Sequence, residues 1–592
     1  MHLPSVPGLA HASHSLTDAL RRRIRASDVW FIALALLVGL IAGLLTLLQS
    51  SLAHSAQAWL YGLDADARLS AVPELSTSQL LVLPLGGLVV GLLGMAARAR
   101  KRQLIDAVEA NALYGGRMSM RDNLIVSAQT LLSNGCGASV GLEAAYTQMG
   151  AGSGSHLGRI LRLRRADIRT LVGAGAGAAI AAAFGAPLAG AFYAFEIVIG
   201  AYSPSALAPV AVASLGAVFV AQASGTQPYL LPASAAAALE ASDYALYALL
   251  GVLCALLAVA VMRLIAAIEQ TINRSRLPRW ARPMVGGTLL IPLAMITPQV
   301  LSSGHGALHL DLTSPTSLRW LGVLLLLKCL GSGISLGFGF RGGLFFASLF
   351  IGSLIGGLYA GVLNLGSGMA LVDGTAASLA GMAAMAAAVV GAPMTMAMLV
   401  LEGTHDFVLA SAVMVAVLVA NTIVRQIFGY SFSTWRLHLR GETIKSARDV
   451  GWVKHLNAGR MMRKDVHPFA ATTTVAQFRR RFPLGSVTRV ILENEDGHYA
   501  GLVTLAAVYA DGANAEAAIV DYAGNRDVAL RLDTDVVTAM RQFDLTQSDE
   551  LAVVDEQGKV LGVLSESFVR KRYAEELDKR QRELMGERVD DE

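Results

Sequence analysis

The stretch GASVGLEAAYTQMGAGSG, residues 137–154, contains a single acidic residue, Glu143, among small and uncharged neighbours. The residues after Gly141 are helix-like, so Glu143 stands where the first turn of a helix is expected. Helix N-termini present unpaired N–H groups and the positive end of the helix dipole, and both attract anions. A carboxylate there has two interpretations. It caps the helix as a structural device, or it occupies a site that a mobile anion would use and leaves when it is protonated or displaced.

The rest of the chain has the composition of a membrane protein. Of its 592 residues, 54% are hydrophobic and only 16% are charged, whereas about 25% is usual in soluble domains. A carboxylate among uncharged membrane spans favours the functional interpretation of Glu143. Four windows, each at least as long as the roughly 18 residues that cross a hydrocarbon core, contain no Asp, Glu, Lys or Arg: 170–195, 342–372, 374–401 and 407–424.

The first predicted span, Val29 to Leu48, follows a basic segment. Its apolar run is longer than that of a signal peptide and no cleavage site follows it, so we expect an uncleaved span. Basic residues stay on the cytoplasmic side of a membrane, which places the N-terminus in the cytoplasm. The basic residues are Arg21, Arg22, Arg23 and Arg25.

Two pairs of segments indicate that the membrane half is duplicated. GAPLAGAFYAFE (185–196) and GAPMTMAMLVLE (391–402) share Gly-Ala-Pro and a Glu nine residues after the Pro. GLEAA (141–145) has its counterpart in GLFFA (343–347), and the two offsets, 206 and 202 residues, agree. Repeats whose broken helices meet at the midplane of the membrane are typical of transporters. Two converging helix N-termini would form an anion site without any side-chain cation.

The composition changes near Arg440, where charged residues return. Beyond it, RVILENEDGHYAGLVT (489–504) resembles ELAVVDEQGKVLGVLS (550–565), 61 residues later. Each copy alternates like a strand, passes an acidic turn that ends in Gly, and continues as a second strand. A helix-like run with an apolar face precedes each copy.

This repeat resembles a tandem pair of cystathionine-β-synthase (CBS) repeats over about 455–575, a small α/β module that often senses adenine nucleotides. In copies that bind a nucleotide, an Asp that holds the ribose usually follows three residues after the Thr or Ser that ends the second strand. Those positions are Ala507 and Phe568 here. A packing or dimerisation module is therefore favoured over nucleotide binding.

The motifs of the membrane half resemble those of the CLC family of chloride channels and transporters, most closely its bacterial branch, over about 29–440. The family's gating motif Gly-x-Glu-Gly-Pro matches 141–145, and its Gly-x-Phe-x-Pro motif matches 343–347. The resemblance implies that Glu143 is the gating carboxylate, that each copy of a homodimer contains one pathway, and that the protein lies in the bacterial inner membrane. The residues it implies in anion binding are Gly141, Leu142, Gly343, Leu344, Phe345, Phe346 and Ser433.

The two motifs depart from the family pattern. Both motif prolines are replaced by alanine, Ala145 and Ala347, and Leu142 stands where a basic residue often precedes the gating Glu. The Gly-x-Glu and Gly-x-Phe frames remain, so the backbone of the site is expected to be retained.

The inner contacts of the family are altered more strongly. The loop whose Ser binds the central anion aligns with RKRQLI (100–105) and is missing, and the late tyrosine aligns with Ser433, or with Phe432 after a shift by one residue. The exchangers' internal proton glutamate aligns with Ile197. These differences favour uncoupled or weakly proton-coupled flux.

Other charged residues in apolar surroundings have alternative interpretations. Glu196 and Glu402 either cap structural elements or handle ions. Arg341 stands where the family commonly has Pro; it either attracts anions or makes a backbone or lipid-facing contact. Lys328 either shapes the field around a pore or extends to the membrane interface. His305 is interpreted as a loop histidine.

The expected fold is an all-α polytopic membrane domain of two inverted repeats, followed by a small α/β CBS-pair domain, with both termini cytoplasmic. The expected boundaries are 1–28 for the N-terminal segment, 29–440 for the transmembrane domain, 455–510 and 515–575 for the two CBS repeats, and 576–592 for a charged tail.

The expected function is transmembrane movement of chloride, channel-like or weakly coupled to protons. The alternatives are a sensor or scaffold that acts through the CBS module, and a transporter of a different small anion. No motif indicates an enzyme, a cofactor, a metal site or nucleic-acid binding. The three cysteines, which have no metal-ligand spacing, are Cys136, Cys254 and Cys329.

Overall fold

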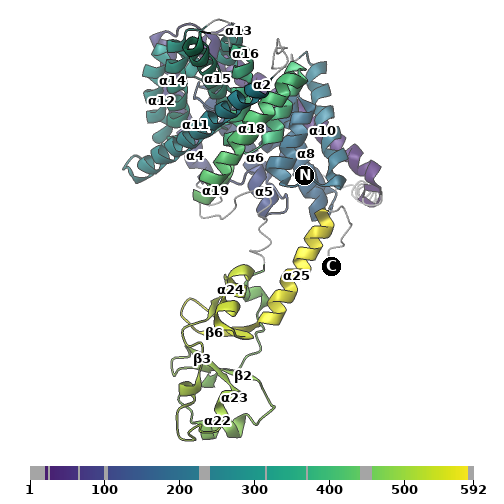
Figure 1. Ribbon diagram of the computed structural model, residues 1–592, viewed down its shortest axis with the longest axis vertical. Coiled ribbons are helices and arrows are strands. Elements are labelled where there is room, and N and C mark those ends of the chain that lie inside the picture. The colour runs from purple at the N-terminus through teal and green to yellow at the C-terminus, as the bar shows by residue number, and fades with distance from the viewer. Residues whose placement is uncertain are drawn as a thin grey trace, which may run out of the picture. The chain divides into compact units, whose positions relative to one another are not determined.

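The computed structural model (Figure 1) divides into two compact units, Met1–Asp449 and Val450–Glu592. Each unit is described by itself. The described residues are 21–24, 27–64, 67–98, 104–225, 240–313, 316–368, 371–439 and 456–584.

The regular secondary-structure elements among the described residues of the first unit are helices. Eight of the described helical segments are long and apolar enough to cross a membrane, as expected for a multi-pass protein. The helices up to the middle of the unit are α2 (Asp28–Tyr61), α3 (Thr77–Leu80), α4 (Val82–Arg98), α5 (Ala107–Leu113), α6 (Met120–Gly135), α7 (Glu143–Ile160), α8 (Arg165–Phe184), α9 (Pro187–Tyr193) and α10 (Pro204–Ala223). Those that follow are α11 (Ala241–Arg274), α12 (Arg282–Ile296), α13 (His305–Thr313), α14 (Leu318–Gly337), α15 (Phe345–Ser367), α16 (Gly374–Val390), α17 (Pro393–Thr404), α18 (Phe407–Ile427) and α19 (Phe432–Leu439).

Two glycine contacts show the duplication in the packing. A Cβ on Gly150 of α7 would lie 2.2 Å from the carbonyl oxygen of Gly175 on α8, and a Cβ on Gly352 of α15 would lie 2.3 Å from that of Gly381 on α16. The two pairs are related by the same offsets, 202 and 206 residues, as the sequence motifs. Between membrane helices there is little hydrophobic driving force, so close backbone approach at small residues stabilises the packing.

The repeated Gly-Ala-Pro motif is a helix-to-helix turn. Gly185 ends α8 and Gly391 ends α16, both with left-handed backbone (φ 68° and 84°) that favours glycine. Pro187 and Pro393 then begin α9 and α17 at the first helical position, where a missing N–H costs nothing.

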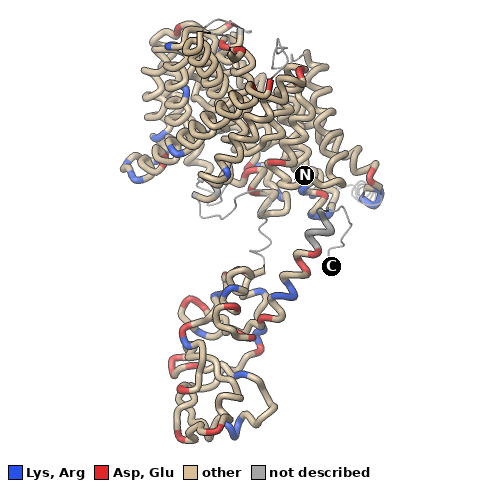
Figure 2. Tube along the Cα trace, viewed as in Figure 1, with Lys and Arg blue, Asp and Glu red and all other residues tan. Residues whose placement is uncertain are grey.

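Basic residues of the first unit gather along one end. This end carries α19 and the end of α11, and Lys and Arg residues are concentrated there (Figure 2). We call it the basic end.

The second unit contains two three-stranded sheets of the same design. In each, a short first strand pairs parallel with the second, and the second pairs antiparallel with the third across a hairpin. Gly497 and Gly558 turn the two hairpins with φ of 77° and 85°. The strands are β1 (Phe469–Ala470), β2 (Arg489–Glu493) and β3 (Tyr499–Thr504) in one sheet, and β4 (Leu530–Arg531), β5 (Glu550–Val554) and β6 (Val560–Ser565) in the other.

Helices complete the two copies. Phe478 of α22 (Val475–Arg481) and Phe543 of α24 (Val536–Thr546) are the fully buried aromatic residues of the two separate cores. A third cluster joins the sheets and consists of Ile491, Leu502, Ala552 and Val563. The remaining helices are α21 (Ala458–Met461), α23 (Leu505–Val508) and α25 (Glu566–Leu584), which continues past residue 576 into the charged segment. This duplicated α/β design is the one expected for a CBS pair.

Candidate anion pathway

The N-termini of α7 and α15 meet through a backbone contact between the two repeats. The N–H of Gly141 donates to the carbonyl of Gly343 (2.9 Å), and the N–H of Gly343 donates to that of Gly141 (3.1 Å). Each glycine precedes the first residue of its helix, Glu143 or Phe345, by two positions. The positive ends of two helices are thereby brought to one place, as the repeated sequence frame predicts.

Two serines hold these loops in a symmetric exchange. The N–H of Ser139, in the first loop, donates to Oγ of Ser335 on α14 (2.9 Å). The N–H of Arg341, in the second loop, donates to Oγ of Ser133 on α6 (3.0 Å). The two donors, Ser139 and Arg341, are 202 residues apart in the sequence, and so are the two acceptors, Ser133 and Ser335. A proline at position 341 could not make this bond because it lacks an N–H.

The Glu143 carboxylate lies over the glycine contact. A Cβ on Gly141 would lie 1.9 Å from Glu143 Oε2, and a Cβ on Gly343 would lie 3.1 Å from it. The backbone N–H of Phe346 is directed toward the carboxyl group. Glu143 is only 4% exposed, and its Oε2 has no hydrogen-bond partner among the described residues. The carboxylate therefore fills a cradle between two helix N-termini without being fully bonded there.

A cavity of about 150 Å³ opens beside this carboxylate, and we call it the Glu143 cavity. Its walls include residues of α5, α6, α7, α9, α16 and α19 and of the loop before α15. Both candidates for the position of the family's tyrosine, Phe432 and Ser433, line it. The other predicted site residues in its wall are Gly343, Leu344, Phe345 and Arg341.

Several predicted residues lie outside this wall. Gly141 and Leu142 form the backbone behind the carboxylate, and Ile197 is buried in the apolar core. Of the segment 100–105, residues 100–103 lie outside the described residues. The carbonyl of Ile105 accepts a bond from Gln148 Nε2 (2.9 Å).

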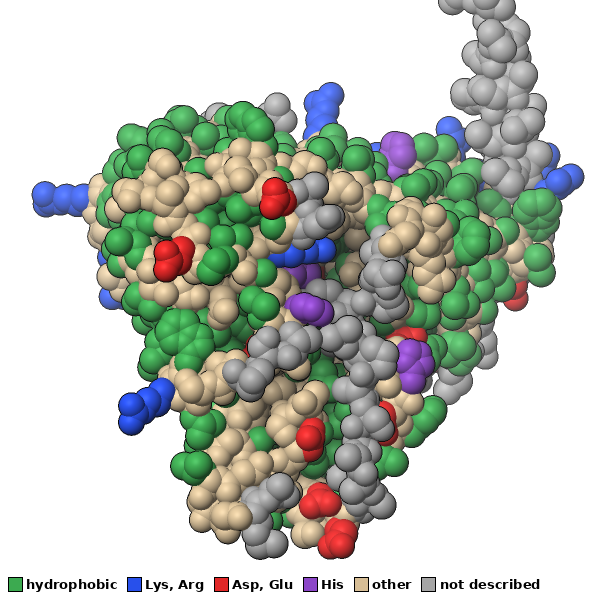
Figure 3. Space-filling model, turned by 90° about the horizontal axis from the view of Figure 1, so that it is seen from above, with side chains coloured by type: hydrophobic (Ala, Val, Ile, Leu, Met, Phe, Trp, Pro, Cys, Tyr) green, Lys and Arg blue, Asp and Glu red, His purple; other side chains and the backbone are tan. Residues whose placement is uncertain are grey.

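Phe346 faces a second group of polar residues. Its ring stacks on His305 (centroids 3.7 Å apart), whose Nδ1 is hydrogen-bonded to Ser303 Oγ. Lys328 is fully buried nearby, and its Nζ donates to the carbonyls of Val300 and Ser302, both at 3.0 Å. Seen from the end that carries α13 and α16, the surface is hollowed, and histidine and basic side chains border the hollow (Figure 3). Lys328 therefore lies inside the protein and does not extend to the interface.

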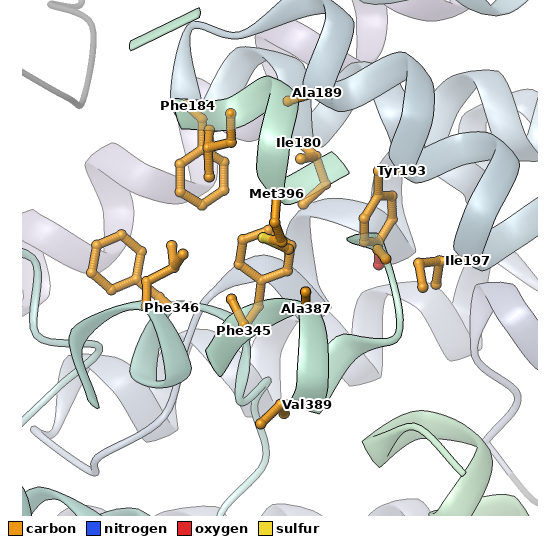
Figure 4. Close-up of a cluster of buried hydrophobic side chains, with 14 of the residues drawn as sticks. Ile180, Phe184, Ala189, Tyr193, Ile197, Phe345, Phe346, Ala387, Val389 and Met396 are labelled. Carbon is orange, nitrogen blue, oxygen red and sulfur yellow. The ribbon is translucent and has the colours of Figure 1, made fainter. Parts of the chain in front are cut away.

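An aromatic cluster surrounds the start of α15 (Figure 4). The ring of Phe184 lies 5.2 Å from that of Phe345 and 6.1 Å from that of Phe346, and Tyr193 lies 6.1 Å from Phe345. Ile197 lies on the far side of Tyr193 from Phe345 (Figure 4). The cluster forms an apolar boundary around the two N-termini.

Glu196 and Glu402 form a second symmetric exchange. Glu402 accepts the backbone N–H groups of Leu188 and Ala189, both at 2.8 Å, in the first turn of α9. Glu196 accepts those of Met394 and Thr395, both at 3.0 Å, in the first turn of α17, together with the Thr395 hydroxyl. Each carboxylate thus caps the helix of the other repeat, and the two helices run antiparallel.

Some residues of the site escaped the sequence analysis. Tyr193 and Arg436 line the Glu143 cavity, and Ser133 and Ser335 position its loops. The two serines stand at matching positions of the repeat, so extending the repeat alignment beyond the motifs would have found them. The described residues contain no cluster of His, Cys, Asp and Glu that could hold a metal ion.

Comparisons with known proteins agree with this architecture. The family model described as "Voltage gated chloride channel" matches residues 97–425. A putative chloride channel protein ClcB-like of Ralstonia nicotianae is 32% identical over 400 residues, which cover 65% of this chain and 91% of the relative. The voltage-gated ClC-type chloride channel ClcB of Escherichia coli is 30% identical over 392 residues, 64% of this chain and 92% of the relative.

Solved structures share the fold. A slow cyanobacterial Cl⁻/H⁺ antiporter aligns with a TM-score of 0.61 at 22% identity, covering 69% of this chain and 97% of that one. A eukaryotic CLC transporter aligns with a TM-score of 0.57 at 17% identity, covering 93% and 98%. A CLC-type fluoride/proton antiporter aligns with a TM-score of 0.56 at 20% identity, covering 67% and 95%. The chain belongs to the voltage-gated chloride channel (CLC) family.

Proposed function

We propose that this protein moves small anions across a membrane, chloride foremost, with Glu143 as the gate of a pathway inside each copy of the chain. The observation that carries the proposal is the position of Glu143 Oε2, in the cradle formed by Gly141 and Gly343 at two helix N-termini. A bound carboxylate and a bound anion would compete for the same N–H groups and dipole ends.

The incomplete hydrogen bonding of the carboxylate would allow it to act as a gate. Its Oε2 has no hydrogen-bond partner among the described residues. Protonation would remove its charge and its attraction to the helix N-termini, and the Glu143 cavity gives an anion access to the same place. Backbone dipoles bind an anion firmly enough for it to enter and weakly enough for it to leave.

Weak or absent coupling to protons is the favoured form of transport. Ile197 cannot carry a proton, and both carboxylate oxygens of the neighbouring Glu196 accept bonds from the first turn of α17. Two of the solved structures with this fold are nevertheless described as proton antiporters, so exchange is the competing form.

The basic end faces the cytoplasm in this proposal, since positive residues are retained on that side. The distribution of Lys and Arg in the membrane unit supports this orientation (Figure 2). Both termini would then be cytoplasmic, in a protein of the bacterial inner membrane.

A homodimer is proposed on the resemblance to the family. Neighbouring helices α9, α10, α17 and α18 carry apolar side chains that a second copy would cover. The second unit would serve packing or dimerisation without a nucleotide, because Ala507 and Phe568 stand where a ribose-binding Asp is expected. The most exposed large apolar side chains on these helices are Phe407, Phe219, Ile427 and Leu207.

The test is anion efflux from liposomes that contain the purified protein, recorded with chloride and proton electrodes together. Glu143→Ala and Glu143→Gln are compared with wild type, and Glu74→Gln, at an exposed position, is the matched control. Chloride release that depends on Glu143 without proton movement supports the proposal. Uphill proton movement driven by chloride release would show that the protein is a chloride/proton exchanger and that weak coupling is wrong.

Two further outcomes address the alternatives. Release of another small anion in preference to chloride would change the substrate. No release of any small anion from folded protein would end the transport proposal in favour of a sensor or scaffold that acts through the CBS pair.

A further inference from the structure

Two arginines link the Glu143 cavity to a larger one. Arg341, in the loop before α15, and Arg436, on α19, line both the Glu143 cavity and a neighbouring cavity of about 560 Å³. The larger cavity, which we call the arginine cavity, is lined by residues of α4, α12, α14 and the end of α11. It therefore lies at the basic end of the membrane unit, directly beside the route to Glu143.

The wall of the arginine cavity contains more arginines than carboxylates. Its wall contains one carboxylate, Glu269, and four guanidinium groups. The Glu143 cavity, in contrast, has the carboxylates of Asp106 and Glu143 beside the two shared arginines. Two of the four arginines are thus shared with a cavity whose charges balance, and Arg279 and Arg282 leave a positive surplus over Glu269 in the arginine cavity. A cleft with low-dielectric walls focuses such a field and concentrates anions. The four groups are those of Arg279, Arg282, Arg341 and Arg436.

The backbone of one shared arginine is fixed, and the side chain of the other is oriented. The backbone N–H of Arg341 is fixed by Ser133 Oγ (3.0 Å). The guanidinium of Arg436 lies over the ring of Phe432, 5.8 Å from its centroid, and Phe432 itself lines the Glu143 cavity. The contact with Phe432 orients the flexible side chain of Arg436 and lowers the entropy lost on binding a ligand.

The ligand that fits this arrangement is a small oxyanion. A guanidinium offers a planar fork of N–H groups that pairs with two oxygens at once. Two arginines with such forks line both cavities on the route to Glu143.

We propose that Arg341 and Arg436 form a loading site for small oxyanions such as nitrate at the basic end of the pathway. At this site the protein binds planar oxyanions in preference to halides, before the anion reaches the cradle at Glu143. This proposal rests on the transport function proposed above.

The test compares nitrate and chloride in liposome flux and in direct binding. The half-saturating concentration of each anion is measured for wild type, Arg341→Gln, Arg436→Gln and Arg436→Lys. Arg425→Gln, at an exposed arginine of α18 that lines neither cavity, is the matched control. Calorimetric titration of nitrate into the detergent-solubilised protein reports the site even if flux is absent, so failure of the transport proposal is distinguishable.

The glutamine variants are expected to raise the half-saturating concentration of nitrate about ten-fold, in line with the loss of a charge-assisted hydrogen bond, and that of chloride much less. Arg436→Lys keeps the charge without the fork, so it is expected to lose the preference for nitrate while chloride flux is retained. Equal changes for both anions, or wild-type nitrate affinity in the Arg436 variants, would overturn the proposal. If Arg341→Gln does not fold, the nitrate and chloride values of the two Arg436 variants test the proposed oxyanion site.

Discussion

Gly141 and Gly343, 202 residues apart in the sequence, exchange two backbone hydrogen bonds at 2.9 and 3.1 Å. Neither repeat could form this contact alone, because each loop satisfies the other's backbone groups at a depth where water is scarce. The cradle for an anion is therefore a product of the duplication, and the same holds for the serine and glutamate exchanges that surround it.

Alanine at the two glycines should block this cradle to different degrees. In Gly141→Ala the new Cβ would lie 1.9 Å from Glu143 Oε2, whereas in Gly343→Ala it would lie 3.1 Å away. The carboxylate ends a flexible side chain and can move away, but the added methyl then fills the place that an anion would use. We therefore expect anion flux to fall about ten-fold in Gly141→Ala and less in Gly343→Ala. Liposome efflux measures both. Equal flux in the two variants would contradict the assigned geometry, and Gly366→Ala, where a Cβ meets open space, is the control.

Flux should rise as the pH falls. Protonation neutralises the Glu143 carboxylate, which then loses its attraction to the N-termini of α7 and α15 and vacates the cradle. Glu143→Gln resembles the protonated form at every pH, so its flux is expected to be high and independent of pH. Efflux measured between pH 4 and pH 8 checks this, roughly the range over which a carboxyl in a protein titrates. A pH profile that survives in Glu143→Gln would assign the titration to another group.

The sequence was sufficient for the framework because the framework depends on small residues and on repetition. The Gly-Ala-Pro turns, the Gly141 and Gly343 frames and the two hairpins of the second unit all appear as local patterns with fixed offsets. Each pattern needs a specific backbone or a close approach, so the residue type itself carries the information.

The side-chain environment of the site could not be read in the same way. Lys328 was open to an interfacial interpretation until the structure placed its Nζ between the carbonyls of Val300 and Ser302. Arg436 carried no motif, yet the position of α19 brings it to the wall that also contains Arg341. Such neighbours come together through tertiary packing over long separations, which no local pattern specifies.

The caps of α9 and α17 should contribute to stability and not to flux. Glu402→Gln and Glu196→Gln each remove a charged acceptor from two backbone N–H groups, so we expect each to lower the free energy of unfolding by about 1–3 kcal/mol. Thermal unfolding in detergent, with efflux recorded in parallel, measures both effects. The two sites cap different helix N-termini, so the double variant should be additive. Loss of flux at unchanged stability in Glu196→Gln would instead assign that residue to ion handling.

Lys328 should stabilise the fold from inside the membrane unit. It is fully buried, its Nζ donates to two carbonyls, and it lies 5.8 Å from the centroid of the Phe350 ring. Lys328→Met keeps the length of the side chain but leaves the carbonyls of Val300 and Ser302 without this donor, which should lower the free energy of unfolding by about 1–3 kcal/mol. Leu326→Met, at a neighbouring position that is 66% exposed, is the control and should change little. Removing a buried charge also relieves its desolvation cost, so equal or greater stability in Lys328→Met would mean that this cost outweighs the two hydrogen bonds.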